Sequence, residues 1–184
     1  YTFDPEKGGE IIFYYTVDEI DNITVKFHRI KGSGFEETPF KTDRPKGRVG
    51  TKLNLKNDSS YFKEVMPKGY HYATKDELTD KKDSAGNPLK QPDKEVEYVK
   101  DGRQEEEKIY IVGDANSSIT VNFVDMKTGQ VVLSDRPKGK TGDELDLTEN
   151  SDYLGGKEQE LQRKNYYYAS ENELKEGQKY PGKV

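Results

Sequence analysis

The chain of 184 residues contains no cysteine, which excludes disulfide bonds, cysteine-type zinc sites and thiol chemistry. It has no apolar run approaching the roughly 18–20 residues that a membrane-spanning helix needs. Its 30 basic and 35 acidic residues are interleaved, so no basic stripe indicates a nucleic-acid partner. Only 30% of its residues are hydrophobic and 35% are charged, which predicts thin cores under very polar surfaces.

The residue patterns of familiar enzyme sites are also missing. The two histidines, His28 and His71, have no cysteine partner and no H-E-x-x-H spacing, so we interpret them as ordinary strand residues. The sequence has no G-x-S-x-G nucleophile motif. We therefore expect no catalytic residue, no enzyme activity and no cofactor.

Metal binding is not expected either, although calcium in two acidic loops stays open as an alternative. Neither loop has EF-hand spacing. The acidic and amide side chains concerned are Asp80, Asp83 and Asn87 in one loop, and Asp143, Asp146 and Asp152 in the other.

An internal repeat organises the sequence. The pentapeptide DRPKG occurs at Asp43–Gly47 and again at Asp135–Gly139, 92 residues later. Matching blocks flank both copies in the same order, with ITVKF facing ITVNF upstream and GYHYATKDEL facing NYYYASENEL downstream. A repeat of this kind indicates one structural unit written twice. We therefore expect two domains, 1–113 and 114–184.

The second copy shows the expected elements most compactly. Ser118–Asp125 alternates apolar and polar residues, which predicts a half-buried strand, and Gln130–Pro137 returns as the second strand of a hairpin. After a brief extended stretch at Leu145 and Leu147, Ser151 is a residue type that caps helices, and good helix formers follow it. Tyr166–Ser170 is strand-like.

The first copy predicts the same order of elements. Its hairpin joins Ile23–Arg29 to Phe35–Thr42, and a short helix is expected around Ser59–Val65. A strand at Tyr70–Thr74 follows. The polar stretch Asp76–Glu95 predicts an exposed loop.

Two strands, Glu95–Lys100 and Lys108–Gly113, are expected to close the first copy, with Glu105–Glu107 as a solvated turn between them. The segment Tyr1–Tyr15 lines up with Tyr98–Val112, which predicts an extra strand at the N-terminus. We expect a tandem array cut at one period boundary, which leaves the sheet edge of the second copy open.

The order strand, strand, helix, strand, strand favours an α+β fold. The most specific expectation is two tandem β-grasp (ubiquitin-like) domains, each a small mixed sheet with one helix, in an elongated arrangement. In that fold the first and last strands lie parallel at the centre of the sheet, and the helix packs on its apolar face.

These motifs resemble the mucus-binding (MucBP/Mub) repeats of cell-surface adhesins in lactic-acid bacteria, in particular the long two-domain type. The family pattern I-T-V-x-[FY]-x-D, a Thr-Gly turn and G-[KR]-x-G matches ITVNFVDMKTGQVV with GKTGDEL, and ITVKF with GRVGTKL. The first copy departs at the turn, where HRIKGSGFEE replaces V-D-x-x-T-G. The resemblance covers about four-fifths of the chain.

The resemblance implies an extracellular, cell-wall-anchored and non-enzymatic protein. Its expected partners are mucin glycoproteins, immunoglobulins and tandem copies of the same repeat, all bound without covalent chemistry. The competing hypothesis is a structural stalk that binds nothing and holds an adhesive tip away from the cell wall.

Two sets of residues are candidates for ligand binding. The basic residues of DRPKG would form a repeated finger for sialic acid or sulfate, because arginine forks suit such anions. Tyr167 lies at the centre of YYY, where alternation turns it away from Tyr166 and Tyr168. For DRPKG the structural alternative is a strand terminator, and for the tyrosines it is core packing. The basic residues are Arg44, Lys46, Arg136 and Lys138.

Overall fold

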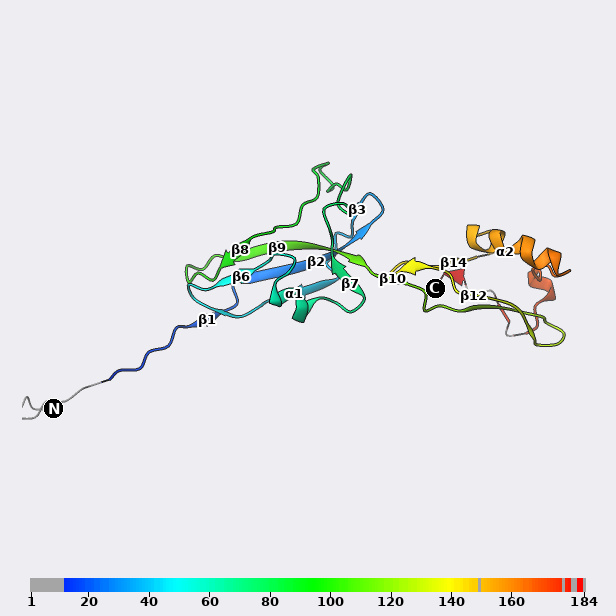
Figure 1. Cartoon of the computed structure of the whole chain (residues 1–184), viewed down its shortest axis with the longest axis horizontal. Helices are drawn as coiled ribbons and strands as arrows, with labels where there is room; N and C mark the ends of the chain where they lie inside the picture. The colour runs from blue at the N-terminus through cyan, green and yellow to red at the C-terminus, as the bar shows by residue number, and fades with distance from the viewer. Residues whose placement is uncertain (1–11, 149, 177, 180–181, 184) are drawn as a thin grey trace, which may run out of the picture. The chain divides into compact units, whose positions relative to one another are not determined.

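The computed structural model describes residues 12–148, 150–176, 178–179 and 182–183, which fall into two compact units (Figure 1). The first unit comprises residues through Met66 with Tyr72–Ile111, and the second comprises Pro67–His71 with residues from Val112 onward. Among the described residues, each unit contains β-strands and one α-helix, which confirms the predicted α+β class. No helix among the described residues is long and apolar enough to cross a membrane.

Among the described residues, the two copies of the repeat share most of their elements in the same order. Up to Gly113 the elements are β1 (Glu19–Ile20), β2 (Ile23–Lys31), β3 (Gly34–Phe35), β4 (Lys41–Asp43), β5 (Gly47–Arg48), β6 (Lys52–Asn54), α1 (Ser60–Val65), β7 (Tyr70–Tyr72), β8 (Glu95–Glu97) and β9 (Glu105–Gly113). In the second half they are β10 (Ala115–Asn116), β11 (Val121–Val124), β12 (Val131–Asp135), β13 (Gly139–Lys140), β14 (Asp146–Leu147), α2 (Asp152–Arg163), the 3₁₀ turn η1 (Glu171–Glu173) and β15 (Gly182–Lys183).

The first unit is built around strand β2. One edge of β2 pairs with β3 and β4 in antiparallel fashion, and the other edge pairs with β9 in parallel, with β7 beyond β9. The two longest arrows of this unit in Figure 1 are β2 and β9. Val25, Phe27, Ile109 and Ile111 are completely buried along this pair. Burial on both faces is the usual condition of parallel strands.

Helix α1 closes the apolar face of this sheet. The Ser59 side chain accepts a hydrogen bond from the Phe62 amide and caps the helix, which lies where the sequence predicted it. Phe62 is buried and packs edge-on against Phe27 of β2, with ring centroids 6.2 Å apart. A six-residue helix is marginal alone, so this packing stabilises it.

The second unit confirms the predicted hairpin and helix. Strands β11 and β12 pair in antiparallel fashion around a turn in which Asp125 accepts hydrogen bonds from the Lys127 and Thr128 amides. Ser151 caps α2 through the Leu154 amide. Strand β14 pairs with β15, as β6 pairs with β8 in the first unit.

The expectation of a solvated turn at Glu105–Glu107 is wrong. These residues begin β9 and pair with Ile23–Val25 of β2. Glu107 is only 7% exposed, and its carboxylate lies 2.7 Å from the ammonium of Lys94. Three consecutive glutamates enter a strand because β2 supplies the ladder and Lys94 supplies the counter-charge.

The strand expected at Tyr166–Ser170 is also wrong, because these described residues form no strand. Their counterpart β7 pairs with β9, and the described residues of the second unit supply no strand equivalent to β9. Strand propensity without a partner does not make a strand.

The expected exposed loop at Asp76–Glu95 is only partly exposed. Leu78 and Leu89 are 7% and 6% exposed, and Gln91 donates to the carbonyls of Ala73 and Tyr110. Apolar residues spaced within a polar stretch therefore anchor the loop to the first unit.

The predicted N-terminal strand falls largely on residues 1–11, which lie outside the described residues. Ile12–Tyr15 is described, and it forms no strand. Its four side chains are between 56% and 90% exposed.

We predict that Lys94→Ala destabilises the first unit, because it leaves the Glu107 carboxylate buried without its counter-charge. The expected loss is about 1–3 kcal/mol in the free energy of unfolding, measured by chemical denaturation. Lys26→Ala is the matched control, because it removes the neighbouring pair with Glu106, whose side chain is 49% exposed. Equal losses in the two variants would contradict the role given to Glu107.

Candidate functional site

The two DRPKG segments occupy the same position in the two units. Asp43 ends β4, and Arg44–Lys46 lead to β5, which pairs with β1. Asp135 ends β12, and Arg136–Lys138 lead to β13, which pairs with β10. Each segment therefore carries the chain from the hairpin into a small antiparallel ladder at the start of its unit.

The aspartate of each DRPKG segment holds the helix of its own unit. The Tyr61 hydroxyl of α1 donates to Asp43 at 2.7 Å, and the Tyr153 hydroxyl of α2 donates to Asp135 at 2.8 Å. Burial, and then the adjacent carboxylate, raise the pKa of both tyrosines. Lys157 lies 3.0 Å from Asp135, and its hydrogen bond is the main reason that the pKa of Asp135 is lowered. The aspartates are thus structural.

The four basic side chains of the DRPKG segments are exposed. None of them has an ion-pair partner among the described residues, whereas many other cations of the chain are paired. They are the predicted residues Arg44, Lys46, Arg136 and Lys138. Free, exposed guanidinium and ammonium groups can bind carboxylates or sulfates, and each contact is weak in open solvent.

Tyr167 is exposed, although Tyr166–Ser170 does not form the strand from whose alternation its orientation was expected. Its side chain is 72% exposed, and its hydroxyl donates to Glu173 at 2.8 Å, which raises the pKa of Tyr167. Tyr166 and Tyr168 are half-buried, and the Tyr168 hydroxyl donates to the Leu154 carbonyl of α2 at 2.7 Å. Tyr167 therefore offers one aromatic face to solvent while its hydroxyl is already bonded.

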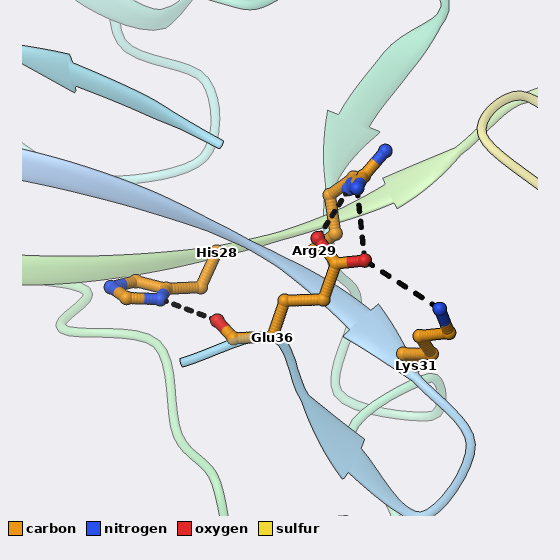
Figure 2. Close-up of polar contacts among 4 residues, drawn as sticks. All are labelled: His28, Arg29, Lys31 and Glu36. Atoms are coloured by element: carbon orange, nitrogen blue, oxygen red, sulfur yellow. Dashed lines mark hydrogen bonds and ion pairs between the residues drawn. The ribbon is translucent and has the colours of Figure 1, made fainter. Parts of the chain in front are cut away.

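The histidines lie in strands, as predicted. Figure 2 shows His28 of β2 beside Glu36, with Arg29 and Lys31 on the other side of that glutamate. A carbonyl only accepts, so the Nδ1–H of His28 donates to the Glu36 carbonyl, at 2.8 Å. Arg29 binds both carboxylate oxygens of Glu36, at 2.6 and 2.9 Å. This cluster stabilises the longer hairpin turn by which the first copy departs from the second.

The acidic loops use their carboxylates locally. Asp83 accepts from the amides of Ala85 and Asn87 and from the Asn87 side chain, and these bonds lower the pKa of Asp83. Asp146 accepts from the amide and hydroxyl of Thr148. Within the described residues, no group of three or more acidic or histidine side chains is arranged to hold a metal ion.

A cavity of about 760 Å³ in the second unit was not anticipated from the candidate residues. Tyr167 contributes to its lining, but none of the four basic residues does. Its apolar walls come from β11, β14 and α2 and include Phe123, Leu147, Leu154 and Leu161. The sequence feature that indicates this cavity is the repeat itself, because the second copy has no segment matching β9 within the described residues.

We predict that Gly47→Ala destabilises the first unit. A Cβ at this position would lie 2.1 Å from a ring carbon of Tyr98, which is only 3% exposed and cannot easily move aside. The expected loss is about 1–3 kcal/mol of unfolding free energy. The matched control is Gly139→Ala, where an added Cβ meets no atom within 4 Å, and stability should change by less than about 0.5 kcal/mol. The reverse order of the two variants would refute this account.

We predict a pH-dependent stabilisation of the second unit by Asp135. Its pKa is lowered on folding, so this contribution is fully present above the ordinary value of 3.8 and disappears as the pH falls through the lowered value. Thermal unfolding of the full chain and of Asp135→Asn should therefore converge at acidic pH. Tyr153→Phe keeps the carboxylate, so its pH-dependent loss of thermal stability should be smaller than that of Asp135→Asn. A constant difference at every pH would contradict the prediction.

Comparison of the chain with protein-family models, with curated proteins and with solved structures finds no match in any of the three. The two DRPKG segments, Tyr167 and the cavity of the second unit are therefore the features of this chain that bear on its function.

Proposed function

We propose that this chain is a repeat unit of an extracellular adhesin on a bacterial cell wall, which binds mucin glycoproteins, immunoglobulins or both without covalent chemistry. The observation that carries the proposal is the equivalent position, in the two units, of two segments whose basic side chains are exposed and have no ion-pair partner among the described residues. The sequence resemblance to mucus-binding repeats supplies the class of ligand. The protein acts as a binding module and not as an enzyme.

Each unit is proposed to be a β-grasp domain. In the first unit this is supported by the parallel pairing of β2 with β9, the antiparallel hairpin of β2 with β4, and helix α1 packed through Phe62. In the second unit it is supported by the equivalent hairpin, helix α2 and the β14–β15 ladder. The proposed domains are 1–113 and 114–184.

The proposed recognition chemistry is anionic. The carboxylate of sialic acid or the sulfate of a mucin glycan would accept hydrogen bonds from Arg44 or Arg136, with Lys46 or Lys138 adding charge. Exposed contacts of this kind contribute little singly. Tandem copies of the repeat would raise the retention through effective concentration.

Tyr167 is a proposed second contact. Its ring is 72% exposed, and its bonded hydroxyl limits rotation of the side chain. A held aromatic face loses little conformational entropy when a sugar ring or a protein side chain packs on it. For an immunoglobulin partner, an exposed strand edge is the alternative route, because an edge accepts an added strand.

The stalk remains the second candidate, and one observation favours it. Asp43 and Asp135 each accept a hydrogen bond from a helix tyrosine, so part of DRPKG is repeated for folding alone. If the basic residues are repeated only because they follow the structural aspartate at the end of a strand, their repetition does not indicate a ligand.

We predict that replacing the four basic residues by alanine lowers retention of the full chain on immobilised mucin about fourfold or more, through four summed losses of about 0.2–1 kcal/mol per contact. The fold should be kept, since these side chains are exposed. Retention of the unaltered chain should fall at high salt and after sialidase or sulfatase treatment of the mucin.

The control variant removes four other exposed cations, two in each unit, and leaves the DRPKG segments intact. These are Lys56, Lys63, Arg163 and Lys179. Equal losses in the two variants would show nonspecific charge attraction and contradict the proposed site. Immobilised polyclonal immunoglobulin provides the second surface. Retention on neither surface by a folded chain would favour the stalk.

A further inference from the structure

The core of the first unit depends on a strand that the repeat pattern places last. Strand β9 pairs along β2, and its Ile109 and Ile111 are completely buried. Phe27 of β2 faces the same core and is completely buried as well. The unit therefore closes its apolar face only when β9 covers the edge of β2 away from the hairpin.

The second unit repeats the elements around this position but supplies no strand for it among its described residues. Its β11 matches β2 and pairs only with β12 in the part of the chain that the structure describes. Phe123, the counterpart of Phe27, is half-buried instead of fully buried. One edge of β11 is thus unpaired within that part of the chain.

An apolar cavity of about 760 Å³ lies against β11. Its lining includes Val121 and Phe123 of β11, Leu154 and Leu161 of α2, and Tyr168. Phe62 and Tyr72, the counterparts of Leu154 and Tyr168, are buried in the core of the first unit, which β9 completes. The cavity therefore offers an apolar surface and a strand edge together.

The sequence also contains a strand-like segment that pairs with no other described segment. Ile12–Tyr15 aligns with Ile109–Val112 of β9. In β9 these residues are at most 7% exposed, whereas Ile12, Phe13, Tyr14 and Tyr15 are 56%, 73%, 90% and 90% exposed. An exposed run of large apolar side chains is a common mark of an interaction site.

We propose that the cavity beside β11 and the unpaired edge of that strand bind the Ile12–Val17 segment of a second copy of this chain, as an added parallel strand. The register of β2 with β9 fixes the expected pairing. Phe27 pairs with Ile109 and His28 with Tyr110. The repeat converts these pairs into Phe123 with Ile12 and Val124 with Phe13.

This pairing joins copies head to tail. Each copy donates its N-terminal segment to one neighbour and accepts the segment of another neighbour in its second unit. Such an interface is heterologous, and its repetition produces a linear filament of copies. Strand addition uses backbone hydrogen bonds for affinity and side-chain pockets for register. The inference concerns assembly and does not depend on the proposed adhesin function.

The absence of cysteine from the chain allows a direct test of the register. The 184-residue chain is prepared as Phe13→Cys and, separately, as Val124→Cys, with different mass tags, and the two are mixed and oxidised. Both side chains are at least half exposed, so neither substitution should disturb folding. The mixed disulfide should form several-fold faster than in the control mixture of Val17→Cys with Val124→Cys, which is four residues out of register.

Competition by a peptide distinguishes disulfides formed by binding at the cavity beside β11 from disulfides formed by chance collision. A synthetic peptide of residues 12–19 should suppress the mixed disulfide, and the same peptide with Ile12→Asp and Tyr14→Asp should not. Sedimentation should show concentration-dependent association of the unaltered chain, and the full chain with those two substitutions should stay monomeric.

Two results would overturn the proposal. One is equal rates of disulfide formation in the matched and out-of-register mixtures. The other is closure within single molecules when Phe13→Cys and Val124→Cys are placed in one chain, at a yield independent of dilution, because the occupant would then be the same copy.

Discussion

The parallel pairing of β2 with β9 is the constraint on which the first unit depends. It joins Ile23–Arg29 to Glu105–Ile111, segments about 80 residues apart, and it completely buries apolar side chains of both strands, among them Phe27, Ile109 and Ile111. Helix α1, the hairpin and the Asp76–Glu95 loop all pack around this pair. Because so few residues are apolar, a core this small depends on each of its strands being covered.

The doubled DRPKG segment combines two requirements. Its aspartate binds a helix tyrosine in each unit, so this residue is fixed by folding. Its glycine is fixed by packing in the first unit, where Tyr98 lies against Gly47, but it meets open space in the second. Folding gives no comparable reason for the exposed arginine and lysine, and they are therefore the part of the segment proposed to bind.

Local signals predicted local structure well. Ser59 and Ser151 mark the two helix starts, and the alternation at Val121–Phe123 marks a strand, because capping and hairpin geometry depend on neighbouring residues. The sequence misassigns Glu105–Glu107 and Tyr166–Ser170 because a distant partner decides their structure. Pairing with β2 brings the three glutamates into a strand, whereas none of the described residues forms an equivalent of β9 beside the tyrosines. The exposure of the candidate cations can be predicted from the sequence, whereas the cavity can be identified only from the fold.

Hydrogen exchange of the full chain tests most directly whether the second unit lacks a strand that the first unit has. The amides of β11 should exchange much faster than those of β2 in dilute solution, and a peptide of residues 12–19 should slow their exchange. Exchange of β11 as slow as that of β2 without the peptide would contradict the account, because its edge would then already be covered.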